Sequence, residues 1–352
     1  MSQATKVARG SPGEVFLAFL KLGLTSFGGP IAHLGYFRDE LVTRRRWLDE
    51  AGYADLVALC QFLPGPASSQ VGFALGLMRA GPMGGLAAWA GFTLPSAALL
   101  VAFALGAGAL EGPIAEGALH GLKLVAVAIV AQAVLGMAKN LTPDRQRAAI
   151  AVLAVWIVAL GGDMWGQVGA IVAGGLAGLW LCRNGTSVVA EHVFPGSRRI
   201  GMALLLGFAA LLAGLPLLAS SWPGLMLFDA FYRAGSLVFG GGHVVLPLLE
   251  TETVARGWVT SDQFLAGYGA AQAVPGPLFA FATYLGFVSN TPPMGLAGGG
   301  IALMAIFLPG LLLVAGTLPF WNQLRHWPLA QAAMRGANAA VVGLLVAALH
   351  DP

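Results

Sequence analysis

The chain has 352 residues, of which 57% are hydrophobic and only 10% are charged, and its formal net charge is +3 at pH 7. Soluble domains carry roughly 25% charged residues, so this composition argues against a soluble enzyme, a nucleic-acid-binding protein and a disordered chain. It predicts a polytopic membrane protein. At about 20 apolar residues per span, the chain has room for about eight to twelve membrane segments.

Apolar runs follow one another along most of the chain. Glycine- and proline-rich runs of this length do not resemble the alternating strands of an outer-membrane barrel, so we expect an all-α fold. The first fourteen residues are polar and show no signal peptide. Cys60 and Cys182 lie in apolar runs without motif spacing and are expected in the core. The runs cover approximately 15–35, 53–78, 84–110, 114–138, 148–161, 164–182, 200–220, 225–248, 263–287, 296–319 and 331–350.

The sequence contains an internal repeat. FLKLGLTSFGG at 19–29 matches FYRAGSLVFGG at 231–241, and a Pro-Gly-Pro triplet follows each copy, at 64–66 and at 275–277. Further matches keep the same order, with an offset between 211 and 214, so coincidence is a poor explanation. We therefore expect a first repeat over 14–139, intervening transmembrane segments over 140–222 with a cytoplasmic linker at 183–199, and a second repeat over 223–350.

The loops predict opposite orientations for the two repeats. Segment 38–46 carries four arginines, and the loops 139–147 and 183–199 are also basic, which places them in the cytoplasm by the positive-inside rule. The counterpart of the first loop, 250–262, carries one arginine and three acidic residues and is expected outside. Inverted repeats of this kind are common in secondary transporters. Whether 15–35 crosses or re-enters at 27–30 stays open.

Each repeat contains helix-breaking motifs inside apolar runs. A Pro-Gly-Pro triplet cannot continue an α-helix, and freed backbone groups in a bilayer must be buried in protein or line a polar cavity. Pro66 and Pro277 are expected to start half-helices near the middle of the membrane, and Gly-Gly steps at 28–29 and 240–241 allow a second break in each repeat. Helix N-termini attract anions. The alternative is a proline kink with glycines that only aid packing.

Charged side chains also occur inside the apolar runs. Lys21 and Arg233 occupy equivalent positions in the repeats, and Lys123 and Arg335 lie in later runs. A cation inside the membrane is costly and normally forms an ion pair or faces a cavity, so these residues predict an oxyanion pocket. The alternative is that they extend to the membrane surface or pair with Asp55 or Asp229.

Polar side chains flank the breaks of the first repeat, whereas the matching positions of the second are apolar. Substrate contacts are therefore expected mostly from the first repeat, with Gln272 and His243 added from the second; His243 could also titrate during proton coupling. The alternative is that serine and threonine bond their own helix backbone. The candidate binding residues are Lys21, Thr25, Ser26, Gly28, Gly29, Pro30, Pro64, Gly65, Pro66, Ser68, Ser69, Gln70, Lys123, Arg233, Gly240, Gly241, His243, Gln272, Pro275, Gly276, Pro277 and Arg335.

These motifs together resemble the chromate ion transporter family. The resemblance rests on KLGLTSFGGPIAH at 21–33, LCQFLPGP at 59–66 and GPMGG at 81–85, with FGGGH at 239–243 and AVPGP at 273–277 in the second half. It implies a secondary transporter of the bacterial inner membrane that exports chromate, with sulfate as a competitor or alternative substrate. The family gives functional weight to the positions matched by Phe27, Gly28, Gly29, Pro30, Pro64, Gly65 and Pro66.

The same features weigh against other classes of protein. Six scattered histidines and two isolated cysteines do not suit a metal-dependent membrane enzyme, and no nucleotide-binding motif is present, so we expect no cofactor, no metal and no nucleic-acid partner. An anion channel would share all the electrostatics and is the main alternative. The partners expected are the oxyanion and the lipid bilayer. The oligomeric state is open, with a homodimer as one option.

Overall fold

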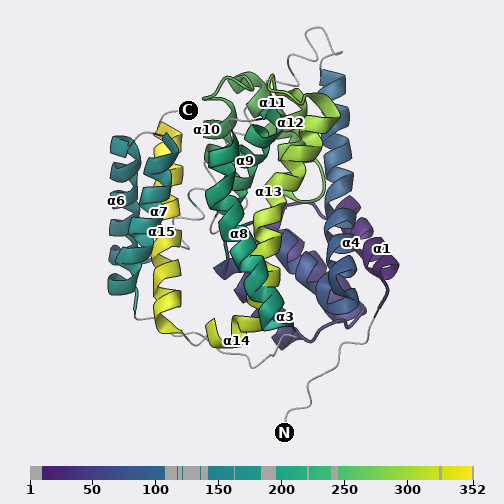
Figure 1. The fold of residues 1–352 in the computed structure, drawn as a ribbon. Coiled ribbons are helices and arrows are strands. Elements are labelled where there is room, and N and C mark those ends of the chain that lie inside the picture. Colours follow the sequence, from purple (N-terminus) through teal and green to yellow (C-terminus); the bar gives the residue numbers. More distant parts are fainter. Residues whose placement is uncertain are drawn as a thin grey trace.

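The computed structural model describes residues 10–107, 142–161, 163–183, 196–219, 222–238, 245–324 and 327–350, and the single residues 117, 121 and 135. These residues form helices and no strand, in agreement with the expected all-α class (Figure 1). The elements are α1 (Pro12–Thr25), α2 (Gly29–Phe37), η1 (Arg38–Arg44), α3 (Glu50–Phe62), α4 (Ala67–Ala107), α6 (Arg145–Gly161), α7 (Asp163–Leu181), α8 (Arg198–Leu218), α9 (Pro223–Ser236), α10 (Val245–Thr253), α11 (Ser261–Ala273), η4 (Leu278–Ala280), α12 (Phe281–Val288), α13 (Gly295–Thr317), η5 (Leu318–Phe320), α14 (Trp321–Leu324) and α15 (Pro328–His350).

Helices α1 and α2 form a hairpin. The Ser11 hydroxyl caps α1 by accepting the Glu14 N–H at 3.1 Å. The chain leaves α1 at Ser26 and turns through Gly28 and Gly29, whose φ angles of +95° and +79° favour glycine. Helix α2 then starts with a proline in its first turn.

Side-chain contacts across this hairpin show that its two arms run back along each other. Lys21 Nζ lies 2.8 Å from a Glu40 carboxylate oxygen, and the rings of Phe19 and Phe37 lie 5.4 Å apart, edge to face. A continuous helix would separate residues 19 positions apart by about 28 Å. The segment 15–35, for which the sequence left two options open, therefore returns to the end of the molecule from which it starts.

Helices α3 and α4 form a second hairpin of the first half. Asp49 caps α3, and the chain breaks at Pro-Gly-Pro before α4 begins at Ala67. Helix α4 is two helices joined at Ala80 and Gly81, where the backbone is not helical. A Cβ added at Gly76 would lie 2.3 Å from the carbonyl oxygen of Gly84, so the two parts lie against each other at these glycines.

The second half places similar helices in the same order. The hydroxyl of Thr260 and the side chain of Gln263 form a capping box at the start of α11. The Pro-Gly-Pro triplet at 275–277 leads through η4 into α12, which packs along α13. The Asn290 N–H, after α12, donates to the carbonyl of Trp258, before α11, at 2.9 Å. The α11–α12 segment therefore also returns to the end from which it starts.

Helices α6, α7 and α15 stand together beside the rest of the molecule (Figure 1). Their contact depends on small residues, because a Cβ added at Gly336 of α15 would lie 2.1 Å from the carbonyl oxygen of Gly174 on α7. Such close backbone approach is typical of helix packing within membranes.

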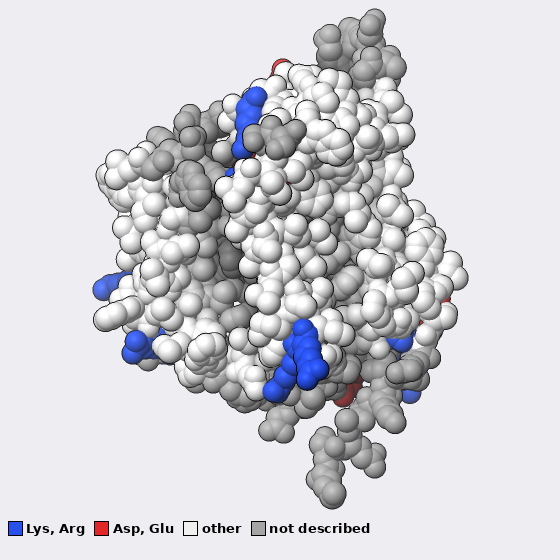
Figure 2. Space-filling model, in the orientation of Figure 1, with Lys and Arg blue, Asp and Glu red and all other residues white. Residues whose placement is uncertain are grey.

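Three of the described helical segments are long and apolar enough to cross a membrane: Ala67–Gly106, Arg198–Leu218 and Gly295–Phe320. A band across the middle of the face in Figure 2 carries no charged side chain among the residues drawn as described, while lysine and arginine gather mainly toward the lower end. Both observations agree with a multi-pass membrane protein.

Candidate functional site at the meeting of the helix breaks

The breaks of the two halves meet through a reciprocal pair of backbone hydrogen bonds. The Gly65 N–H donates to the carbonyl of Val238 at 2.7 Å, and the Gly276 N–H donates to the carbonyl of Ser26 at 2.9 Å. Gly65 and Gly276 are equivalent in the sequence repeat, and so are Ser26 and Val238. Each Pro-Gly-Pro loop thus binds the chain just beyond the first helix of the other half.

The middle residue of each Pro-Gly-Pro triplet must be glycine. Gly65 has a φ of +121° and Gly276 has a φ of +103°, in a region that other residues rarely adopt. A Cβ on Gly65 would lie 3.0 Å from Cα of Gly310, and a Cβ on Gly276 would lie 2.3 Å from Oγ of Ser96. Backbone conformation and lack of space therefore impose the same requirement in both halves.

The first turn of α4 gathers polar groups at the break of the first half. Ser68, Ser69 and Gln70 are all buried there, with at most 3% of each residue exposed. The first amide groups of a helix have no partner within the helix and attract anions. His33 of α2 faces this turn, with Nδ1 3.4 Å from Oγ of Ser68. A helix therefore starts directly after Pro66, with polar side chains around its start, and its place at mid-membrane stays a prediction.

Five buried polar side-chain atoms near these breaks have no hydrogen-bond partner. They belong to residues that are at most 2% exposed, in α1–α2, the first turn of α4 and its second part. A buried polar atom without a partner costs about 1–3 kcal/mol, so five on neighbouring elements make this region the candidate binding site. The atoms are Ser26 Oγ, His33 Nε2, Ser69 Oγ, Gln70 Oε1 and Thr93 Oγ1.

Sequence reasoning did not name His33 or Thr93 as candidate binding residues. Each is a lone polar residue in an apolar run, although His33 closes the motif that begins at Lys21 and Thr93 stands two residues before Pro95. Their closeness to a helix-breaking motif was the signal available.

Three other polar candidates form hydrogen bonds within the protein, either inside their own half or to the other half. Thr25 Oγ1 donates to the carbonyl of Lys21 at 2.8 Å, which is the expected alternative for a helix hydroxyl. The side-chain amide of Gln70 donates to the carbonyls of Pro64 and Gly310 at 2.9 and 3.1 Å. The side-chain amide of Gln272 donates to the hydroxyl of Tyr268 at 2.7 Å.

The described cations among the candidates all have protein partners. Arg233 pairs with Asp229, one of the acids expected as its alternative partner, and lies 3.6 Å from Glu252. Arg335 donates two hydrogen bonds, of 2.6 and 3.0 Å, to the carbonyl of Cys182, just beyond the end of α7. The structure therefore does not place Arg335 beside the breaks. Lys123, Gly240, Gly241 and His243 lie outside the described residues.

Lys21 is part of a cluster centred on the buried carboxylate of Glu40. That carboxylate accepts from Lys21 and Arg44 at 2.8 Å and from Arg45 at 2.9 Å. Burial raises the pKa of the Glu40 carboxyl, but hydrogen bonds from Lys21 and Arg45 outweigh burial and lower its pKa below the ordinary value. The cluster holds the loop after α2 against α1.

A matching cluster occurs in the second half. Glu252 lies 3.6 Å from Arg233, the equivalent of Lys21, and 2.7 Å from Arg256, the equivalent of Arg45. Arg45 lies over the ring of Trp47 at 5.9 Å, and Arg256 lies over the ring of Trp258 at 5.2 Å. The repeat therefore extends to a cation–glutamate–arginine–tryptophan unit, which explains the positions of Lys21 and Arg233 by internal pairing.

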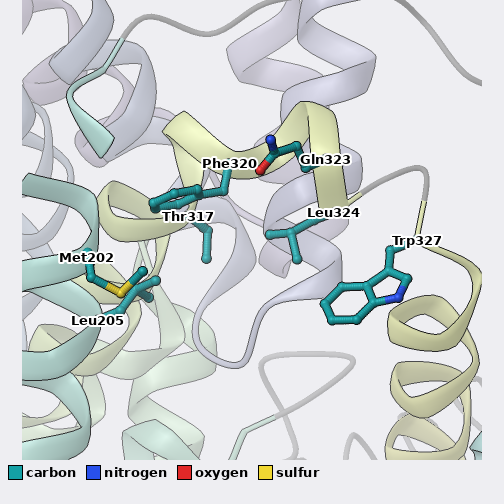
Figure 3. Close-up of a pocket in the computed structure, with 7 residues that line it drawn as sticks. All are labelled: Met202, Leu205, Thr317, Phe320, Gln323, Leu324 and Trp327. Carbon is teal, nitrogen blue, oxygen red and sulfur yellow. The ribbon is translucent and has the colours of Figure 1, made fainter. Parts of the chain in front are cut away.

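A cavity of about 230 Å³ is lined by residues that belong to none of these breaks (Figure 3). It opens between α8 and the segment that follows α13, and none of the candidate binding residues lines it. Its apolar lining does not suit an oxyanion. The lining residues are Met202, Leu205, Thr317, Phe320, Gln323, Leu324 and Trp327.

The strained glycines give the first testable prediction. Gly65→Ala and Gly276→Ala should each destabilise the protein by about 2 kcal/mol or more, because each combines an unfavourable φ with steric overlap. Thermal unfolding of the purified protein, followed by tryptophan fluorescence, measures the effect. Gly300→Ala is the matched control, since a Cβ there meets no atom within 4 Å. Equal unfolding midpoints for all three variants would contradict the prediction.

Comparisons with known proteins agree with the sequence motifs. The family model "Chromate transporter" matches residues 13–179 and 225–351. The chromate transport protein of Pseudomonas aeruginosa is 29% identical over 96% of this chain and 80% of its own length, and that of Cupriavidus metallidurans is 27% identical over 96% and 81%. A comparison with solved structures found no match. The protein is therefore a member of the chromate transporter family.

Proposed function

We propose that this protein is a secondary transporter that exports chromate across the bacterial inner membrane. Family membership and the names of its relatives support chromate as the substrate. The observation that carries the binding site is the group of buried polar atoms without partners beside the first turn of α4. Sulfate, which has the same charge and tetrahedral shape, is proposed as a competitor or alternative substrate.

The proposed architecture is a pair of inverted repeats, over 14–139 and 223–350, separated by the segments 140–222. Reciprocal hydrogen bonds between equivalent residues support it, because a two-fold relation between the halves would produce both bonds together. The matching glutamate-centred clusters support it as well. Basic loops in the first repeat and the acidic counterpart in the second support the opposite orientations.

Neutral groups are proposed to make the direct contacts with the dianion. The helix start at α4 offers amide N–H groups, Ser69 offers a hydroxyl without a partner, and the hydroxyl of Ser68 orients the ring of His33 beside them. The cluster of Lys21 contributes a positive field because it holds three cations on one carboxylate, whereas Arg233 is neutralised by Asp229 and Glu252. The candidates outside the described residues, among them His243, remain expectations for the second half.

Membrane voltage alone can drive export of a dianion. With the cytoplasm negative, outward movement of two negative charges is favourable by roughly 4.6 kcal/mol at about 100 mV. Export therefore needs no obligatory coupling ion, and proton coupling is compatible with the same site.

Chromate flux into proteoliposomes tests this function. Purified protein should carry chromate, sulfate should compete, and unlabelled chromate on the far side should accelerate uptake, because a carrier shows counterflow and a channel does not. Ser68→Ala combined with Ser69→Ala should raise KM about tenfold or more, since hydrogen bonds to charged groups contribute about 1.5–3 kcal/mol.

Thr25→Ala is the matched control, because its hydroxyl bonds its own helix, and KM should change less than about twofold. Uptake without counterflow would indicate an anion channel of the same architecture. Wild-type vesicles without chromate uptake would rule out the proposed function.

Cysteine labelling tests the proposed orientation. In a background with Cys60 and Cys182 changed to alanine, Gly13→Cys and Thr43→Cys should react with a membrane-impermeant maleimide only from the cytoplasmic side. Ser261→Cys, at the start of α11, should react only from outside, because the second repeat is inverted. All three positions are exposed. Reaction of Thr43→Cys and Ser261→Cys from the same side would contradict the inverted repeat.

A further inference from the structure

His33 occupies a fixed position at the break of the first half. It lies in α2, three residues after Pro30, and is only 1% exposed. Its ring meets the ring of Phe92 edge to face, with centroids 5.2 Å apart and an angle of 87° between the planes. This packing orients the imidazole, because an edge-to-face contact restricts rotation of the ring.

The orientation leaves one ring nitrogen available. Nδ1 lies 3.4 Å from Oγ of Ser68, and the ring also has a polar contact with the backbone of Ser26. Nε2 is buried and has no hydrogen-bond partner. A histidine that served only to fill the core would be expected to use both nitrogens, since a buried polar atom without a partner is costly.

Acidic groups do not explain the position of His33. Among the residues that the structure describes, no carboxylate forms a hydrogen bond or an ion pair with His33. The carboxylate of Glu40, seven residues after His33, forms ion pairs with Lys21, Arg44 and Arg45. The hydroxyl of Ser68, in the first turn of α4, and the ring of Phe92 lie beside the imidazole instead, and a helix start is an environment suited to a bound anion.

We infer that His33 is a substrate-contact residue whose Nε2–H donates a hydrogen bond to an oxygen of the bound tetrahedral dianion. In this tautomer Nδ1 accepts the hydroxyl hydrogen of Ser68, so the hydroxyl of Ser68 positions the ring. This inference rests on the proposed function and adds a donor from α2 to those of the first turn of α4. A tetrahedral anion presents oxygens in four directions, so donors from two elements bind it better than one helix start alone. Ser69 Oγ and Ser26 Oγ, also buried and without partners, belong to the same set.

Two polar replacements of similar character distinguish this role from a structural one. The side-chain amide of glutamine reaches the position of Nε2, whereas that of asparagine reaches only the position of Nδ1. His33→Gln should therefore keep the KM for chromate within about threefold of wild type, and His33→Asn should raise it about tenfold, with kcat less affected. His33→Leu, which has no donor, should raise KM at least as much as His33→Asn.

Tyr53→Phe is the matched control for packing around α2. It removes the hydrogen bond of 2.7 Å from the Tyr53 hydroxyl to the carbonyl of Leu34, the residue after His33, without touching the proposed site. Its KM should equal that of wild type even if its unfolding temperature falls. The measurements are initial rates of chromate uptake into proteoliposomes and, independently, equilibrium binding of chromate to the purified variants.

The outcomes separate the inference from the function on which it rests. Wild-type protein that neither carries nor binds chromate would end the proposed function. Wild-type transport combined with wild-type KM for His33→Asn and His33→Gln would overturn the role of His33 alone. Should His33→Leu fail to fold, the comparison of the glutamine and asparagine variants still decides the question.

Discussion

The fold depends on the requirement that backbone groups exposed by broken helices find partners inside the protein. Within a bilayer no water is available to bind a free N–H or carbonyl group, so a helix break costs several kcal/mol for each group left without a partner. Gly65 binds the carbonyl of Val238 and Gly276 binds that of Ser26. Each half thus supplies the carbonyl group that binds the glycine N–H at the Pro-Gly-Pro break of the other half.

The polar groups that remain without partners beside these breaks are the ones proposed to bind a ligand. Beside the satisfied loop amides, the hydroxyls of Ser26 and Ser69 and Nε2 of His33 are buried without partners. Two of the cations that the sequence predicts in the pocket instead form ion pairs, Lys21 with Glu40 and Arg233 with Asp229. A site of neutral donors binds a dianion through directed hydrogen bonds, and it avoids burying several unpaired positive charges when the ligand is absent.

The sequence predicted the parts of this structure that follow from local chemistry. A triplet such as Pro64-Gly65-Pro66 breaks a helix in any context, and the chain is non-helical at both Pro-Gly-Pro triplets. Ser26, Ser68, Ser69 and Gln70, which the sequence offered as candidates, are buried near the first break, and their role in binding stays a prediction.

Long-range pairing could not be predicted in the same way. The partner of Lys21 is Glu40, 19 residues away in a basic loop, and only the hairpin of α1 and α2 brings them together. Arg335 bonds a carbonyl just beyond the end of α7 because glycines let α15 approach that helix closely. The only local signal at His33 is its closeness to the Gly-Gly-Pro motif, since its contact with Ser68 joins residues 35 positions apart.

A structure determined with chromate bound, with chromium located by its anomalous scattering, tests the central claim most directly. We expect a single chromium peak between α2 and the first turn of α4, within hydrogen-bond reach of Ser68 and His33. A peak at Lys21 or Arg335, or in the apolar cavity beside α8, would contradict the account.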